Sequence, residues 1–193
     1  MTRRNLTKQE IIEEAIVLLE LEGLDGLSMR KLAARLDVRA PTLYYHIPDK
    51  HALLNEVSNV LFERCFDRMP ECETWQDWML AFGEAIWEVQ HEERFASALI
   101  MSNQIDEEHF QRSVDRVHAE LSRFEADPER LFFVQSAIQA IMTGWSIFSN
   151  AAYADKLGKF VDFKAAAMNS AQALIDSWEA QISDRSLRKP QQD

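Results

Sequence analysis

The amino-acid sequence predicts an all-α protein, and three observations lead to this fold class. Only five Gly and five Pro occur in 193 residues, whereas Ala, Leu, Glu and Ile are plentiful, which favours helices over sheets with Gly-rich turns. Apolar residues recur at helical spacing. Capping residues and prolines separate these stretches into helices with short connections. We therefore expect an N-terminal three-helix domain, a linking helix and a C-terminal helical bundle.

The first helix is expected at about residues 7–22. Thr7-Lys8-Gln9-Glu10 has the form of a capping box, which marks a helix start. Gly23 ends the helix, and Gly26 closes a short turn. The apolar face of this helix consists of Ile12, Ala15, Ile16 and Leu19.

Two short helices follow. Ser28 caps the second helix, whose apolar stripe is Met29, Leu32, Ala33 and Leu36. Pro41 suits the first turn of a third helix, and Pro48 ends it. On a helical wheel Leu43 and Ile47 share one side of this third helix, and Tyr44 lies at the edge. The opposite, exposed side carries Pro41, Thr42, Tyr45 and His46.

Asp49 can cap a long fourth helix that continues until Pro70. This linking helix predicts two domains, residues 1–49 and residues 50–193. Further helices are expected near 74–91, 94–102, 106–125, 129–152 and 160–182, with breaks at Asp127-Pro128 and Gly158.

The net charge of −11 argues against a nucleic-acid partner for the chain as a whole. The charge is unevenly distributed, however, because residues 1–50 are neutral overall. Within them, residues 26–50 carry five basic and two acidic residues. An acidic body would repel DNA and restrict its contact to this short basic stretch.

Residues 28–50 have the plan of a helix-turn-helix whose second helix enters the DNA major groove. Thr42, Tyr45 and His46 suit contacts with base edges. The residues better placed for phosphates are Ser28, Arg30, Tyr44 and Lys50. The alternative is two short helices of a bundle with their aromatic pair inside. Against it, the adjacent Tyr44, Tyr45 and His46 cannot all point inward on a helix that buries Leu43 and Ile47.

A family resemblance covers about residues 7–57. The run Leu24-Asp25-Gly26-Leu27-Ser28-Met29-Arg30-Lys31-Leu32-Ala33, then Leu36, Val38 and Pro41-Thr42-Leu43-Tyr44-Tyr45-His46, resembles the DNA-binding domain of the tetracycline-repressor (TetR) family. Asp49-Lys50 and Ala52-Leu53-Leu54 extend the likeness into the linking helix, and Trp75-Gln76-Asp77-Trp78 resembles the start of the ligand domain in tetracycline repressors. The resemblance implies DNA contacts from Ser28, Arg30, Arg39, Ala40, Pro41, Thr42, Tyr44, Tyr45, His46 and Lys50. The family's usual turn glycine is Asp37 here, and Asp tolerates a positive φ.

Residues 58–193 carry many aromatic side chains, which either fill a core or line a pocket in a bundle. In the family the ligand lies among the helices after the linker. This implies a lining of Phe62, Phe66, Trp78, Phe82, Trp87, Phe110, Val114, Ile138, Met142 and Trp145. Phe66 and Phe82 stand where tetracycline repressors use polar groups to hold a magnesium–drug chelate. We therefore expect a flat apolar or aromatic effector, with Asn103, Gln104, Gln135 or Gln139 as polar contacts.

No metal, cofactor or catalytic residue is expected. His91, His109 and His118 have acidic neighbours, which fits a solvated helical face as well as a metal site. The nine-residue separation of His109 and His118 does not fit a pair of ligands on one helix. No nucleophile–base pair or Gly-rich phosphate loop is found, so the chain is not expected to be an enzyme, although an α-helical enzyme is kept as an alternative.

The two cysteines, Cys65 and Cys72, would lie about 10 Å apart along one continuous helix, too far for a disulfide, and are expected to be reduced. Residues 1–5 lack the apolar segment of a secretory signal. No apolar run approaches the roughly 20 residues that span a bilayer. These observations predict a cytoplasmic protein without a membrane partner.

A homodimer is expected because one short recognition helix reads too few base pairs. The last two long helices are the predicted interface. Their small and apolar residues are Ala151, Ala152, Ala165, Ala166, Ala167, Ala171, Ala173, Ile138, Ile141, Phe148, Leu174, Ile175 and Trp178. The sequence thus predicts a ligand-responsive repressor that binds a palindromic operator in double-stranded DNA and is released by a small effector. A DNA-binding regulator without an effector is the alternative.

Overall fold

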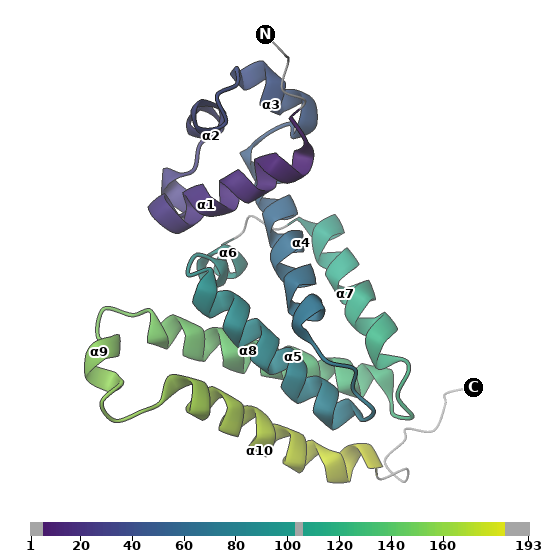
Figure 1. The fold of residues 1–193 in the computed structure, drawn as a ribbon. Coiled ribbons are helices and arrows are strands. Elements are labelled where there is room, and N and C mark those ends of the chain that lie inside the picture. Colours follow the sequence, from purple (N-terminus) through teal and green to yellow (C-terminus); the bar gives the residue numbers. More distant parts are fainter. Residues whose placement is uncertain (1–5, 103–105, 184–193) are drawn as a thin grey trace. The chain divides into compact units, whose positions relative to one another are not determined.

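The computed structural model describes residues 6–102 and 106–183, and this part of the chain is built from helices without any strand (Figure 1). The predicted all-α fold is confirmed. The helices are α1 (Lys8–Gly26), α2 (Met29–Arg35), α3 (Ala40–His46), α4 (Lys50–Arg68), α5 (Trp75–Glu92), α6 (Ala96–Met101), α7 (Glu107–Leu121), α8 (Pro128–Ser149), α9 (Ala154–Leu157) and α10 (Phe163–Ser183).

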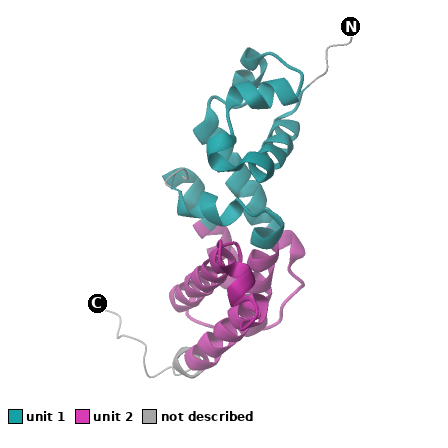
Figure 2. Ribbon diagram, turned by 90° about the vertical axis from the view of Figure 1, so that its left-hand side faces the viewer, with its two compact units in different colours: residues 1–64, 89–113 teal, residues 65–88, 114–193 magenta. Residues whose placement is uncertain are grey.

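The chain forms two compact units, coloured separately in Figure 2. Unit 1 comprises residues 1–64 and 89–113, and unit 2 comprises residues 65–88 and 114–193. Unit 1 therefore contains the first three helices, residues 50–64 of α4 and residues 89–113. The functional boundary expected at residue 49 falls between α3 and α4, and it stays a prediction.

The start of α1 is fixed by the capping box that the sequence predicts. The Glu10 backbone N–H donates to Thr7 Oγ1 over 3.2 Å, and the Thr7 N–H donates to Glu10 Oε2 over 2.8 Å. Gly23 interrupts the helix with φ 68° and ψ −175°, a conformation that glycine adopts without steric cost. The predicted stop at Gly23 is confirmed as a kink, after which a last helical turn continues to Gly26.

Unit 1 has its own apolar core, to which the first four helices contribute. The buried residues include Ile11, Ile12, Ala15, Leu19, Leu32, Leu43, Ile47, Leu53 and Val57. Full burial of one such aliphatic side chain contributes about 1.5–3 kcal/mol. Arg64 of α4 also pairs with Glu13 of α1 and Glu93 beyond α5, both over 2.9 Å. These contacts explain why residues 89–113 belong to unit 1.

Unit 2 is a bundle in which α8 runs along α10 (Figure 1) and also packs against α5. A Cβ at Gly83 of α5 would lie 2.9 Å from Met142 Cε and 3.1 Å from Ile138 Cγ2, so glycine permits this close approach. Helix α10 also contacts α5, because Lys164 Nζ lies 2.8 Å from Glu84 Oε1 and 3.4 Å from Glu88 Oε1. Hydrogen bonding to Glu84 raises the pKa of Lys164.

Helix α8 differs from the sequence-based expectation about membranes. Its 22 residues are long and apolar enough to cross a bilayer by length and composition, so the expectation that no apolar run reaches this length is wrong. Leu131, Val134, Ile138 and Met142 of α8 are fully buried inside unit 2. A core helix of a bundle has the same composition as a membrane span.

The predicted helices beyond residue 50 match the structure to within a few residues at most ends. The clearest difference is α9, whose four residues lie in a stretch expected to be irregular. No side chain caps α9, and a single turn is too short to show helical periodicity.

Candidate nucleic-acid interface and effector site

The turn between α2 and α3 depends on one residue with unusual backbone geometry. Asp37 has φ 53°, as expected where Asp replaces a turn glycine. The Asp37 N–H donates to the Ala34 carbonyl over 3.2 Å, and the Val38 N–H donates to the Ala33 carbonyl over 3.0 Å. These bonds close the end of α2 and direct the chain into α3.

Helix α3 buries one side and exposes the other, as its sequence predicts. Leu43 is fully buried, Ile47 directly after the helix is 1% exposed, and Tyr45 is 87% exposed. Tyr44 is half-exposed, and the rings of Tyr45 and His46 meet edge to face with centroids 5.2 Å apart. Arg39, Pro41 and Thr42 are also exposed, and Ala40 and His46 are partly exposed.

Two of the basic residues near α3 form ion pairs with acidic residues of α1. Lys31 pairs with Glu22, and Arg35 pairs with Glu14, so acidic groups of α1 offset part of the local positive charge. Sequence reasoning missed these two pairs because their partners lie 9 and 21 residues away. Arg30 is exposed.

Two residues predicted to contact DNA phosphates also have structural partners. The Lys50 ammonium donates to the Leu24 carbonyl over 2.7 Å in a partly buried position. It ties the start of α4 to the last turn of α1, with two N–H donors remaining. The Ser28 hydroxyl caps α2 by accepting from the Lys31 N–H over 3.3 Å.

The exposed face of α3 therefore offers a phenol, an imidazole and a small hydroxyl on a helix narrow enough for a DNA major groove. The buried residues Leu43 and Ile47 hold this face outward. The geometry defines a helix-turn-helix.

Several of the predicted effector-site residues come together in unit 2. Trp78 and Phe82 are buried and stacked, with ring centroids 5.0 Å apart. Phe66 lies 5.8 Å from Phe82 and 6.5 Å from Trp78. The guanidinium of Arg116 lies 4.5 Å from the centroid of the Phe66 ring, a cation–π contact that sequence reasoning missed. Phe66 and Phe82 thus form one aromatic cluster with Trp78.

The other predicted lining residues are more dispersed. Ile138 and Met142 are fully buried against Gly83, Trp87 is buried and Val114 is half-buried, all in unit 2. Trp145 contacts the rings of Phe148 and Phe163, with centroids 6.0 and 6.4 Å apart. Phe62 and Phe110 belong to unit 1, where Phe110 is 61% exposed. An exposed ring gives Phe110 no enclosed position in this chain.

The polar residues predicted near the effector have mixed outcomes. Gln135 is buried and donates to Gln139 Oε1 over 3.1 Å. Ser146, on the same helix, is buried and its Oγ has no hydrogen-bond partner, a residue that the sequence did not single out. Asn103 and Gln104 lie outside the described residues.

The structure also shows what the histidines and cysteines contact. His118 stacks on Phe132 with centroids 4.6 Å apart, and His109 Nδ1 lies 2.7 Å from Asp106 Oδ1. In the described ranges no group of three His, Cys, Asp or Glu side chains could hold a metal ion. Neither Cys65 nor Cys72 forms a disulfide, as predicted, and Cys72 lies beyond the end of α4.

The fold and the α2–α3 geometry define an all-α protein with an N-terminal helix-turn-helix. Residues 11–57 match the family model of bacterial regulatory proteins of the tetR family. The chain is 36% identical over 87 residues to the Escherichia coli tetracycline repressor protein class E, spanning 42% of this chain and 41% of that protein. It is 33% identical over 98 residues to an HTH-type transcriptional regulator of Saccharopolyspora erythraea, spanning 51% and 42%. These matches span less than half the length of the curated relatives.

Solved structures extend the likeness over most of the chain. A TetR variant from Acinetobacter baumannii AYE in complex with minocycline has a TM-score of 0.74 at 26% identity, covering 93% of this chain and 100% of that one. ActR from Streptomyces coelicolor in complex with actinorhodin has a TM-score of 0.77 at 16% identity, covering 94% and 99%, which shows a shared fold. The N-terminal part of the chain therefore matches the tetR family, and the TetR structure extends the likeness in fold over most of the chain. This confirms the resemblance found in the sequence, and it agrees with a regulator rather than an enzyme.

Proposed function

We propose that this chain is a transcriptional repressor that binds a palindromic operator in double-stranded DNA as a homodimer and leaves it when a small apolar or aromatic effector binds. The observation that carries the proposal is helix α3, which exposes 87% of Tyr45 while burying Leu43 and Ile47. A large aromatic side chain with a polar tip suits an interface, because its ring can pack while its hydroxyl bonds a polar group. The base edges of a major groove supply such a partner.

The proposed DNA contacts are the ten residues implied by the family resemblance. Tyr45, His46 and Thr42 on the outer face of α3 would read bases, and the exposed Arg30 and Tyr44 would reach phosphates. Lys50 is proposed to anchor a phosphate with one N–H while another N–H donates to the Leu24 carbonyl. The proposed place of action is the cytoplasm, where bacterial DNA lies.

The homodimer is supported by apolar side chains that unit 2 leaves exposed. Phe133 and Phe148 of α8 are 58% and 45% exposed, and Phe133 contacts the ring of Trp178 on α10. Ile138 and Ile175, which the sequence also assigned to the interface, are fully buried within one chain. They have no remaining surface to offer a partner, so the outer faces of α8 and α10 would supply the dimer contact.

The effector site is proposed in unit 2 around Phe66, Trp78 and Phe82. Stacked aromatic rings form walls for a flat ligand, and the buried Ser146 hydroxyl on α8 is free to bond one polar atom. Two regulators of similar fold are known in complex with small molecules, minocycline and actinorhodin. A protein of this fold can therefore enclose an organic ligand.

The test is selection of bound sequences from randomised duplex DNA, followed by titration of the enriched duplex. Wild type is expected to enrich a palindrome and to lose affinity steeply as salt rises. Tyr45→Ala, which should lose about 1–3 kcal/mol of operator binding, is expected to enrich the palindrome much more weakly, whereas the matched control Phe160→Ala, an aromatic residue 86% exposed in unit 2, should enrich it as wild type does. A folded wild-type dimer that enriches no sequence contradicts the proposal.

A regulator without an effector is the second candidate. Thermal unfolding in the presence of a library of aromatic and acyl compounds separates the two, because a ligand that binds the folded state raises Tm. A compound that raises Tm and also lowers operator affinity supports the repressor with an effector. If no compound does so, unit 2 is a dimerisation scaffold.

A further inference from the structure

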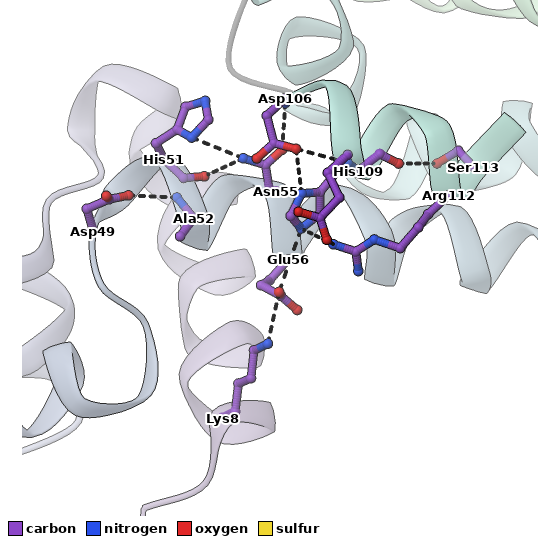
Figure 3. Close-up of polar contacts among 11 residues, drawn as sticks. Lys8, Asp49, His51, Ala52, Asn55, Glu56, Asp106, His109, Arg112 and Ser113 are labelled. Atoms are coloured by element: carbon purple, nitrogen blue, oxygen red, sulfur yellow. Dashed lines mark hydrogen bonds and ion pairs between the residues drawn. The ribbon is translucent and has the colours of Figure 1, made fainter.

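A buried amide joins two distant helices within unit 1 (Figure 3). Asn55 of α4 is fully buried. Its Nδ2 donates to the His51 carbonyl over 3.0 Å, and its Oδ1 accepts the backbone N–H of Asp106 over 3.0 Å. Asp106 directly precedes α7, and 51 residues separate it from Asn55. One side chain thus binds the first turns of α4 to the start of α7.

Asp106 also organises the first turn of α7. Its Oδ1 accepts the His109 backbone N–H over 2.9 Å, and the His109 ring Nδ1 lies 2.7 Å from the same oxygen. These hydrogen bonds to His109 lower the pKa of Asp106, because they favour its charged form. The amide that Asn55 binds therefore belongs to a turn with its own fixed geometry.

A second contact runs parallel to the first and reaches α1. His109 Nε2 lies 3.7 Å from Glu56 Oε1, and that oxygen pairs with Lys8 Nζ over 2.9 Å (Figure 3). Lys8 is the first residue of α1, and Glu56 follows Asn55 in α4. The start of α7 is therefore connected to both long helices that support the helix-turn-helix in unit 1.

An apolar side chain at position 55 would pack α4 into the same core without directional bonds. A buried amide costs free energy unless its polar atoms are satisfied, and a satisfied polar network holds its members in one arrangement. Asn55 meets both conditions, since its oxygen and its nitrogen are each bonded. It fixes the position of α7 along α4, which apolar contact alone does not do.

We propose that Asn55 and the backbone N–H of Asp106 form a latch through which the start of α7 and the DNA-binding helices respond together. Asn55 is then a positioning residue for the recognition helix. This inference rests on the proposed function and adds a route of regulation to it. Since α4 and α7 both continue into unit 2, an effector bound there would act on DNA affinity through the latch. Coupling between two sites is reciprocal, so DNA binding must in turn stabilise the start of α7.

The test measures amide hydrogen exchange of the full-length protein, free and bound to the duplex enriched by selection. In wild type, bound DNA is expected to slow exchange at residues 106–110 by about fivefold or more, the lower end of typical allosteric coupling. Asn55→Ser keeps a hydroxyl for the His51 carbonyl but cannot reach Asp106. In this variant the DNA-dependent slowing at 106–110 should fall below about twofold, while slowing in α3 persists.

The matched control is Asp49→Ala, which removes the contact of Asp49 Oδ1 with the Ala52 N–H at the start of α4. It weakens the same helix end without touching α7, so its DNA-dependent slowing at 106–110 should equal that of wild type. Equal loss in Asp49→Ala and Asn55→Ser would overturn the latch, because general weakening of α4 would explain both. Wild-type protein that binds DNA and shows no slowing at 106–110 would overturn it as well.

A second pair of variants tests the latch if Asn55→Ser does not fold. Asp106→Pro and Asp106→Ala both lose the carboxylate cap, but only Pro loses the N–H that Asn55 accepts. The latch predicts that Asp106→Ala retains most of the DNA-dependent slowing in the first turn of α7 and Asp106→Pro loses it. If the two variants behave alike, the latch is refuted. Wild type that binds no duplex refutes the proposed function itself and the latch with it.

Discussion

Helix α3 and the aromatic cluster of unit 2 use the same kinds of side chain in opposite ways. In α3 the aromatic Tyr45 is 87% exposed and aliphatic residues form the buried side. In unit 2 the rings of Trp78 and Phe82 are stacked and buried. An aromatic residue therefore indicates an interface only where other residues of the same helix form its buried side and leave the aromatic residue exposed.

The two regions also differ in how far relatives resemble them. The family model covers residues 11–57, which include α3, whereas most of unit 2 is matched by fold alone at identities such as 16%. The phosphate backbone of duplex DNA has the same charge and spacing whatever the base sequence, whereas effectors can differ in chemistry from one regulator to another. The family model accordingly ends before Phe66 and Phe82, around which the effector site is proposed.

Phe82→Ala is the strongest test of the buried region. Phe82 is fully buried between Phe66 and Trp78, so its truncation should lower the free energy of unfolding by about 3–5 kcal/mol. Phe160→Ala, a phenylalanine 86% exposed in the same unit, should change stability by less than about 0.5 kcal/mol. Urea denaturation of both variants measures this, and similar values for the two would show that the cluster is not a packed core.

The cysteines test burial in unit 2 by chemistry. Burial raises the pKa of the Cys65 thiol from 9.0 to about 12, with Arg68 lowering it in part. At a fixed pH near 8, a shift of this size leaves about a thousandfold less reactive thiolate. In the native protein a disulfide reagent should therefore titrate Cys72 first, and Cys72→Ala should show no fast thiol until it is unfolded. Fast reaction in Cys72→Ala would mean that the Cys65 thiol of α4 is accessible to the reagent and not buried.

Leu43→Ala and Tyr45→Ala separate the two sides of α3. Leu43 is fully buried, so its truncation should cost about 2–5 kcal/mol of stability. Tyr45→Ala should leave stability within about 0.5 kcal/mol and weaken operator binding by about 1–3 kcal/mol. Denaturation and fluorescence anisotropy of a labelled duplex measure the two quantities. An unchanged operator affinity in Tyr45→Ala would remove the recognition role from this side of α3.

The sequence predicted the N-terminal helices closely because their signals are local. The capping box at Thr7, the break at Gly23 and the inward side of α3 each follow from a few neighbouring residues. The same reasoning predicted most of the later helices, since long apolar stripes and Asp127-Pro128 mark their limits. Local pattern is sufficient where a side-chain cap or a long apolar stripe marks the helix, and it fails for the single turn α9, which has neither of these.

Contacts between distant residues were not predicted. The bond from Asn55 to Asp106, the ion pair from Arg64 to Glu13 and the ring contact of Arg116 with Phe66 depend on how helices pack. Periodicity identifies the apolar side of a helix but not its neighbour. For this reason the lining residues Phe62 and Phe110 were grouped with unit 2 residues, although they belong to unit 1.

Asp37→Gly should give the smallest effect and the most local one. Asp37 is exposed and has φ 53°, so glycine relieves backbone strain there without changing any buried contact. Since Asp tolerates this conformation better than most residues, we expect the variant to be more stable by only about 0.5–1 kcal/mol. Asp37→Val should be destabilised, because a β-branched side chain is strained at positive φ. Lower stability of Asp37→Gly in urea denaturation would contradict this expectation. It would mean that the Asp37 carboxylate stabilises the turn, so that Asp at the usual glycine position strengthens the helix-turn-helix.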